Sequence, residues 1–294
     1  MGWDEKEEWR QKFLRVLAGF RLLDDDFMTA AFQDNLECVD LVLQIILDKP
    51  QLKATKVTTQ DTLKNLQGRS VRLDIHAFAD GQEFNIEIQR SGKGAAERRA
   101  RYNSSLMDAN ALLAGEDYDK LPESYVIFIT ETDVLAKGLP LYVVERVVKG
   151  INEDFVDGSH IIYVNSSMMD EDTPLGKLMH DFRCTQADDM YYDVLAERVR
   201  YLKETEEGAR NMCEAMEMLT NEAEMRGMER GMERGMERGM ERGMERGMEQ
   251  GMEQGKTAVI LGMLKEKLPL EMIARVSDSS MDKIREIGKM HHLL

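Results

Sequence analysis

The sequence predicts a mixed α/β fold, in which helices flank a sheet of parallel and antiparallel strands and a helical extension follows at the C-terminal end. Residues 70–90 alternate between apolar and polar side chains around the pair Asp80-Gly81, a strong signal for a two-residue β-hairpin turn. Residues 125–129 form a short continuous apolar run, typical of a strand that is buried on both faces of a sheet. Segments with helical spacing surround both, so the expected architecture is an α/β sandwich.

Three helices are expected before the hairpin. Residues 3–18 carry apolar side chains at helical spacing. The acidic run 24–26 is a start signal for a second helix through Phe32. A third helix runs from about residue 36 to residue 47, and Pro50 follows its end.

The hairpin is expected to present Val71, Leu73, Ile75 and Ala77 on one face. The elements expected after it are a helix over residues 95–114, strands over 125–129, 141–148 and 160–164, and helical sequence over 175–225.

A low-complexity segment follows, in which Gly-Met-Glu-Arg recurs from Arg226 onward. The repeat is four residues long, so in a helix each residue type shifts round the axis by about 40° from one repeat to the next. Each glycine weakens the helix by about 1 kcal/mol relative to alanine. Two interpretations remain open: a marginal helix that becomes ordered against a second copy of the chain, or repeat expansion in a tolerated linker. The expected domains are a sheet domain over 1–205, the repeat over 206–255, and a small helix-turn-helix-like unit over 256–294, whose mixed charges favour dimerising or capping over DNA binding.

The composition excludes several classes of protein. A formal net charge of −16 at pH 7 repels phosphates, so any contact with DNA must be local. The acidic N-terminus lacks a signal or transit peptide, and no apolar run approaches the ~18 residues of a membrane span, so the expected location is cytoplasmic. Cys38, Cys184 and Cys213 are odd in number and widely spaced, and we expect reduced thiols rather than disulfides or a zinc site.

The hairpin brings together residues that could carry chemistry. A turn at Asp80-Gly81 pairs position 74 with position 87, so Asp74 and Glu87 face each other across the two strands. Like charges directly opposite are destabilising, and a divalent cation removes the conflict. Gln89 lies on the same face. Asp74, Glu87 and the backbone carbonyl of Ile88 supply oxygen ligands for Mg²⁺ or Mn²⁺, which can acidify a water for attack on a phosphodiester. His76 shares this face and is expected to be a neighbour rather than a ligand.

Asp74, the turn, and Glu87-x-Gln89 resemble the PD-(D/E)XK nuclease signature, with Gln89 where the commoner form has lysine. The wider sequence is similar to the bacterial PD-(D/E)XK nuclease family transposases, the Rpn family of recombination-promoting nucleases, over roughly residues 22–205. The matching stretches are residues 26–32, RLDIHAFADGQEFNIEIQR, ERRARYNSSLMDANALL, YVIFITETDVLAKGLPLYVVERVV and DGSHIIYVNSS.

The resemblance implies a restriction-endonuclease-like fold and a metal-dependent DNA endonuclease associated with recombination or mobile elements. Family helices before the hairpin often supply another acid, for which Glu37 is the candidate. Glutamine at position 89 offers a neutral hydrogen bond where lysine would stabilise developing phosphorane charge.

A local basic patch is expected beside the hairpin, from Arg90, Lys93, Arg98, Arg101 and Tyr102. The alternative for each arginine is a solvated helix face.

The alternative to a nuclease is a catalytically weak nuclease-fold protein that binds DNA and forms homo-oligomers through its repeat and C-terminal unit. A strand-joining transposase is disfavoured, because the sequence has no separate acidic triad or zinc-binding module.

Overall fold

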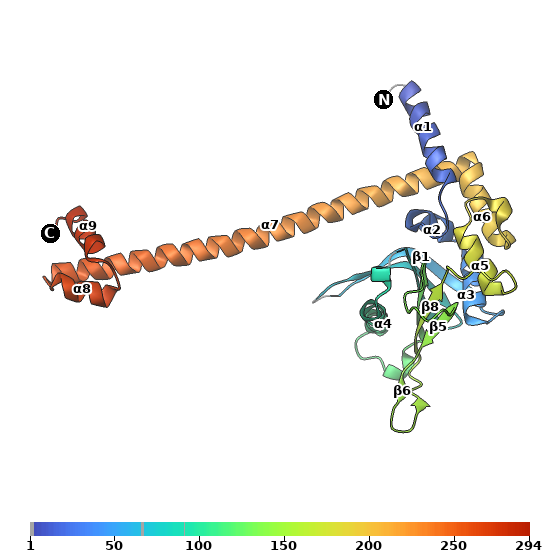
Figure 1. Ribbon diagram of the computed structural model, residues 1–294, viewed down its shortest axis with the longest axis horizontal. Helices are drawn as coiled ribbons and strands as arrows, with labels where there is room; N and C mark the ends of the chain where they lie inside the picture. The colour runs from blue at the N-terminus through green and yellow to red at the C-terminus, as the bar shows by residue number, and fades with distance from the viewer. Residues whose placement is uncertain (1–2, 66–67, 91) are drawn as a thin grey trace. The chain divides into compact units, whose positions relative to one another are not determined.

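The computed structural model describes residues 3–65, 68–90 and 92–294 (Figure 1). The chain divides into two compact units, Met1–Leu219 and Thr220–Leu294. The first unit contains a six-stranded mixed sheet flanked by helices, and the second is helical. In the described residues, no helix is long and apolar enough to cross a membrane.

The sheet of the first unit has the strand order β1-β2-β3-β4-β8-β5. The central strands β3, β4 and β8 are parallel to one another, whereas β1, β2 and β5 join by antiparallel pairing. A separate two-stranded sheet pairs β6 with β7. The bounds are β1 Ala54–Leu63, β2 Val71–Ala79, β3 Gln82–Gln89, β4 Ser124–Thr130, β5 Leu141–Val144, β6 Val147–Val148, β7 Glu153–Asp154 and β8 Ser159–Asn165.

Helices cover both faces of this sheet, with α4 on one side and α3, α5 and α6 on the other (Figure 1). Short 3₁₀ turns lie at Gly92–Ala95, Tyr118–Lys120 and Ala187–Asp189. The bounds are α1 Trp3–Ala18, α2 Asp25–Phe32, α3 Leu36–Leu47, α4 Glu97–Ala111, α5 Pro174–Arg183, α6 Asp193–Glu204, α7 Glu206–Lys265, α8 Leu270–Ser277 and α9 Met281–Met290.

The predicted hairpin is confirmed. Asp80 and Gly81 both have positive φ, +49° and +78°, as a two-residue turn of this kind requires. The observed pairs include Ala77 with Phe84 and end at Ile75 with Ile86. The register predicted from the turn is therefore the one that the structure has.

The sequence predicts a single apolar face for the first strand of the hairpin, and this prediction is wrong. Ile75 and Ala77 pack in the larger core with α2, α3, α5 and α6, whereas Val71 and Leu73 pack in a second core with α4. Residues two apart share a face in a regular strand, so the alternation of β2 is interrupted between Leu73 and Ile75. The facing strand β1 is irregular at the same level, where Gln60 has a φ of +54° and the pairing passes over Gln60 and Asp74. Asp74 is the residue at this interruption, directly beyond Ile75, whose pairing with Ile86 ends the ladder of β2 with β3.

Two further expectations need correction. The strand β1, which pairs along most of β2, is absent from the expected elements. The strand expected over residues 141–148 ends at Val144, because β5 pairs with β8 only that far, and Val147–Val148 pairs with β7 in the small second sheet.

The second unit has its own small core. It is formed by apolar residues from the end of α7, from α8 and from α9, and these are Ile260, Leu264, Ile273, Ile284 and Ile287. The Gly-Met-Glu-Arg repeat is helical and lies within α7. Its methionines from Met228 to Met252 are between 58% and 77% exposed, so these described side chains form no continuous buried face.

Candidate active site

Asp74 and Glu87 lie where β2 separates from β3. The Oδ2 atom of Asp74 accepts a hydrogen bond of 3.1 Å from the backbone N–H of Ile88. Glu87 is fully buried and Asp74 is 8% exposed. The ladder of β2 with β3 ends at Ile75 and Ile86, one residue before Asp74 and Glu87, so the direct pairing of the two acids across the strands stays a prediction.

Polar partners surround the buried carboxylate of Glu87. Arg99 on α4 donates from Nη2 to Oε2 at 2.5 Å, and Asn85 Nδ2 donates to Oε1 at 3.1 Å. Asn103, one helical turn beyond Arg99, places its Nδ2 3.4 Å from the same Oε1. Arg99 also donates to the carbonyl of Gly94. Strand β3 and helix α4 therefore hold the Glu87 side chain in one position.

The acidity of both carboxyl groups is altered. Burial raises the pKa of Asp74 well above its ordinary value, and the charges of Glu87 and Asp25 raise it further, against a lowering effect of the Ile88 N–H and Arg99. Burial also raises the pKa of Glu87, although Arg99 and Asn85 oppose it. The single positive charge of Arg99 therefore does not offset the two negative charges that Asp74 and Glu87 carry when both are ionised.

Asp25, in the first turn of α2, is an acid that the sequence analysis does not single out for this site. Its charge acts on both Asp74 and Glu87. Glu37 is exposed at the start of α3, and no contact among the described residues joins it to either carboxylate. Of the two acids, Asp25 is the one placed near the pair.

Gln89 lies at the end of β3 and turns toward the 3₁₀ turn at Gly92–Ala95. A Cβ added to Gly94 would lie 1.8 Å from its Oε1, so the amide occupies the space that the glycine leaves. The N–H of Ile88 contacts Asp74, which places this peptide at the site. The Ile88 peptide thus adjoins Asp74, whereas the Gln89 amide lies against Gly94, and the role of Gln89 stays a prediction.

The predicted basic patch is only partly free to meet a phosphate. Arg90 pairs with Asp24 and Glu131, and the hydroxyl of Tyr102 is hydrogen-bonded to the Arg69 carbonyl and to Asn65. Arg98 and Arg101 are exposed on α4. The side chain of Lys93 lies outside the described residues.

Arg99 is a site residue that the sequence analysis does not single out, because in the sequence it is one of several arginines at the start of a helix. Its four-residue spacing from Asn103 is a signal that could have found it, since polar side chains at this spacing share one helix face. That face also carries the buried Ala100 and Met107. Polar side chains on a buried helix face need hydrogen-bond partners, so Arg99 and Asn103 indicate a polar group packed against α4.

His76 is buried two residues from Asp74 and is held between two carboxylates. Its Nδ1 lies 2.7 Å from Asp61 and its Nε2 2.7 Å from Glu83. Burial alone lowers the pKa of this imidazole, but the two carboxylates raise it overall. Both ring nitrogens are engaged, so His76 is a neighbour rather than a free metal ligand.

The donor set at Asp74 and Glu87 fits a hard divalent cation. Carboxylate oxygens are the ligands that Mg²⁺ prefers, and it commonly uses one or two of them while keeping several waters. Asn85 Oδ1, beside Glu87, is buried without a hydrogen-bond partner in the described part of the chain. Asp25, Asp74 and Glu87 do not bring their oxygens within 4.8 Å of one another as one group among these residues, so two carboxylates are the closest fit.

Comparison with known proteins identifies a family for most of the chain. The family described as PD-(D/E)XK nuclease family transposase matches residues 38–234, which include every strand of the six-stranded sheet, Asp74 and Glu87. Neither the curated proteins nor the solved structures give a match to the chain. Because the family match covers more than half of the sequence, the chain belongs to the PD-(D/E)XK nuclease family transposases.

Proposed function

We propose that this protein is a metal-dependent DNA endonuclease of the recombination-promoting type, with its reaction centre at Asp74 and Glu87. One observation carries the proposal: two acidic side chains with raised pKa values lie together at the separation of β2 and β3, inside the region that matches a nuclease family. Buried carboxylates without enough compensating charge favour a cation between them.

Asp74 and Glu87 would hold Mg²⁺ or Mn²⁺, with the Ile88 carbonyl as a further oxygen ligand. When bound, such a cation supplies Lewis acidity toward a phosphodiester oxygen and lowers the pKa of a coordinated water. Arg99 positions the Glu87 carboxylate by its ion pair. The Asn85 and Asn103 amides fix the other oxygen of Glu87.

Gln89 and Asp25 would complete the centre. The Gln89 amide can donate a neutral hydrogen bond to a phosphate oxygen or to the attacking water. Asp25 is exposed, so its carboxylate can meet a water at the edge of the site. Arg98 and Arg101 supply exposed positive charge for the DNA backbone, which the net charge of −16 requires to be local.

Cleavage of supercoiled plasmid by the purified full chain tests this function. We expect nicked or linear product with Mg²⁺ or Mn²⁺ and none with chelator. Asp74→Asn should lower the rate by at least about 100-fold, as loss of a group that binds the essential charge does. Asp80→Asn, at the hairpin turn, is the matched control and should cut like the wild type. Equal cutting by both variants would contradict the assignment of the site.

A second candidate is a weakly active or inactive protein that binds DNA and assembles through the C-terminal half. The glutamine at position 89 and the exposed methionines of α7 favour it. It predicts DNA retention without cleavage, unaltered by Asp74→Asn. Gln89→Lys separates the two candidates further, because a lysine restores the positive charge of the commoner signature and should increase cleavage only in a working nuclease.

A further inference from the structure

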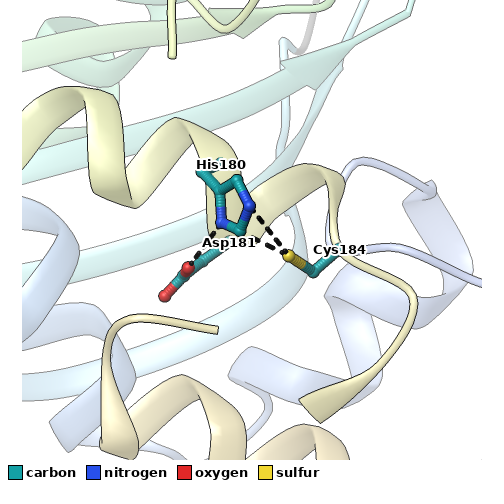
Figure 2. A group of neighbouring side chains, drawn as sticks. All are labelled: His180, Asp181 and Cys184. Atoms are coloured by element: carbon teal, nitrogen blue, oxygen red, sulfur yellow. Dashed lines mark hydrogen bonds and ion pairs between the residues drawn. The ribbon is translucent and has the colours of Figure 1, made fainter. Parts of the chain in front are cut away.

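A second group of metal-binding side chain types lies at the C-terminal end of α5 and includes none of the residues proposed for catalysis. One ligand atom from each of His180, Asp181 and Cys184 lies within 4.8 Å of the others (Figure 2). His180 Nδ1 is 3.3 Å from Asp181 Oδ1 and 3.4 Å from Cys184 Sγ. Asp181 is fully buried, whereas His180 and Cys184 are partly exposed.

The two contacts of His180 Nδ1 cannot both be hydrogen bonds at once. A ring nitrogen either carries a proton and donates, here to the carboxylate, or has a lone pair and accepts, here from the thiol. If it donates to Asp181, the thiol is left with two long contacts, Nε2 at 3.9 Å and the Asp189 carbonyl at 3.8 Å. A cation at the centre would instead satisfy the nitrogen, the carboxylate and the sulfur together.

We propose that His180 Nδ1, Asp181 Oδ1 and Cys184 Sγ bind Zn²⁺, with water in the fourth position. Tetrahedral zinc with bonds of about 2.0 Å to nitrogen and oxygen and about 2.3 Å to sulfur requires ligand atoms roughly 3.3–3.6 Å apart. The distances of 3.3 and 3.4 Å around Nδ1 agree with this requirement. Nitrogen, oxygen and sulfur donors in one set favour zinc over Mg²⁺.

The carboxylate of Asp181 is already held in the way that ligating carboxylates usually are. Its two oxygens accept hydrogen bonds of 2.8 and 2.9 Å from the backbone N–H groups of Tyr191 and Tyr192. Each carboxylate oxygen keeps a lone pair after one such bond, so Oδ1 can still bind a cation. These outer contacts fix the orientation of the ligand.

The charges also balance. A neutral imidazole, one carboxylate and one thiolate together offset the two positive charges of zinc. Burial, together with the charges of Asp181 and Asp189, raises the pKa of the Cys184 thiol to about 11. Binding therefore breaks the S–H bond, forms the S–Zn bond and releases the proton to solvent. All three ligands would come from the last turn of α5 and its C-cap residue, and Asp181 links them to the backbone of Tyr191 and Tyr192 before α6.

Cobalt titration of the chelator-treated full chain tests the site, because Co²⁺ bound to a thiolate has a charge-transfer absorption that Co²⁺ bound only to carboxylates lacks. We expect this band in the wild type and in Asp74→Asn, and its loss on addition of Zn²⁺. Cys184→Ser and His180→Gln should weaken binding by more than about 100-fold, since even loss of an outer-shell partner costs 10–100-fold. Cys213→Ser is the control for a partly exposed thiol elsewhere and should keep the band.

Absence of the band in the wild type, or its persistence in Cys184→Ser, would overturn the proposal. Alkylation of the wild type decides the case if a variant does not fold. Zn²⁺ should slow alkylation of Cys184, mapped by peptide mass, at least 10-fold and leave Cys213 unchanged, and equal rates with and without Zn²⁺ would overturn the site. Asp74→Asn should lose DNA cleavage and keep the cobalt band, so failure of the zinc site and failure of the nuclease proposal give different results.

Discussion

Arg99 on α4 holds the Glu87 carboxylate of β3, with 2.5 Å between Nη2 and Oε2. Glu87 is fully buried, and the arginine, 38% exposed in its side chain, packs over the Phe128 ring. This ion pair links the helix that follows the hairpin to the acid at the centre of the site.

We therefore expect Arg99→Ala to leave Glu87 buried without its cation. Breaking a buried pair costs about 3–5 kcal/mol, and partial exposure of Arg99 reduces this to roughly 1–3 kcal/mol of unfolding free energy. Urea unfolding in chelator measures the loss, and Mg²⁺ should recover part of it. Arg98→Ala, at the exposed neighbouring position, is the control. Equal stability of the two variants would show that the pair has no structural weight.

The raised pKa of Asp74 predicts a particular pH dependence of stability. The folded chain keeps a proton on this carboxyl at pH values where the unfolded chain has lost it, so stability from this group falls as pH rises from about 4 through the folded pKa. Asp74→Asn removes this loss. The variant should gain stability relative to the wild type by at most about 1.4 kcal/mol per pH unit in that window, measured by urea unfolding without metal. A difference that does not change with pH would contradict the prediction.

Asp25 and Glu37 are the two candidates for a third acidic side chain at the site, and their variants should behave differently. The charge of Asp25 reaches both carboxylates of the pair, whereas Glu37 has no such described interaction. Asp25→Asn should slow plasmid cleavage by about 10-fold or more, in the range of general-base contributions, while Glu37→Gln should leave the rate unchanged. The reverse result would return the role to Glu37.

Gly94 tests the position of Gln89 without touching its side chain. Because an added Cβ would lie 1.8 Å from Gln89 Oε1, Gly94→Ala must displace the amide. The amide is the end of a flexible side chain, so stability should change by less than about 1 kcal/mol, while cleavage falls as far as in Gln89→Ala. Gly150→Ala, where nothing lies within 4 Å of the added atom, is the control for cleavage. Full activity in Gly94→Ala would remove Gln89 from the mechanism.

The sequence predicts the parts of the site that depend on local pattern. The turn at Asp80-Gly81 determines the hairpin register, and this register pairs the strands as far as Ile75 and Ile86, the residues next to Asp74 and Glu87. Strand β1 escapes prediction because most of its side chains are polar and it lies at the sheet edge, where only one neighbouring strand supports it.

The contributions of Arg99 and Asp25 depend on tertiary packing instead. Each belongs to a run of like charges in the sequence, and the run does not indicate which member turns toward the core. The cluster around Cys184 does not follow from the spacing of the cysteines, because its partners are a histidine and an aspartate within four residues.

The central claim is that a cation held by Asp74 and Glu87 is required for cleavage of DNA. The most direct measurement titrates Mn²⁺ into the metal-free full chain and follows binding, by electron paramagnetic resonance, and plasmid cleavage in the same samples. The account predicts that both rise over the same Mn²⁺ concentrations, and that Asp74→Asn weakens both together. Cleavage that persists in Asp74→Asn, or Mn²⁺ binding that is identical in the variant and the wild type, would contradict it.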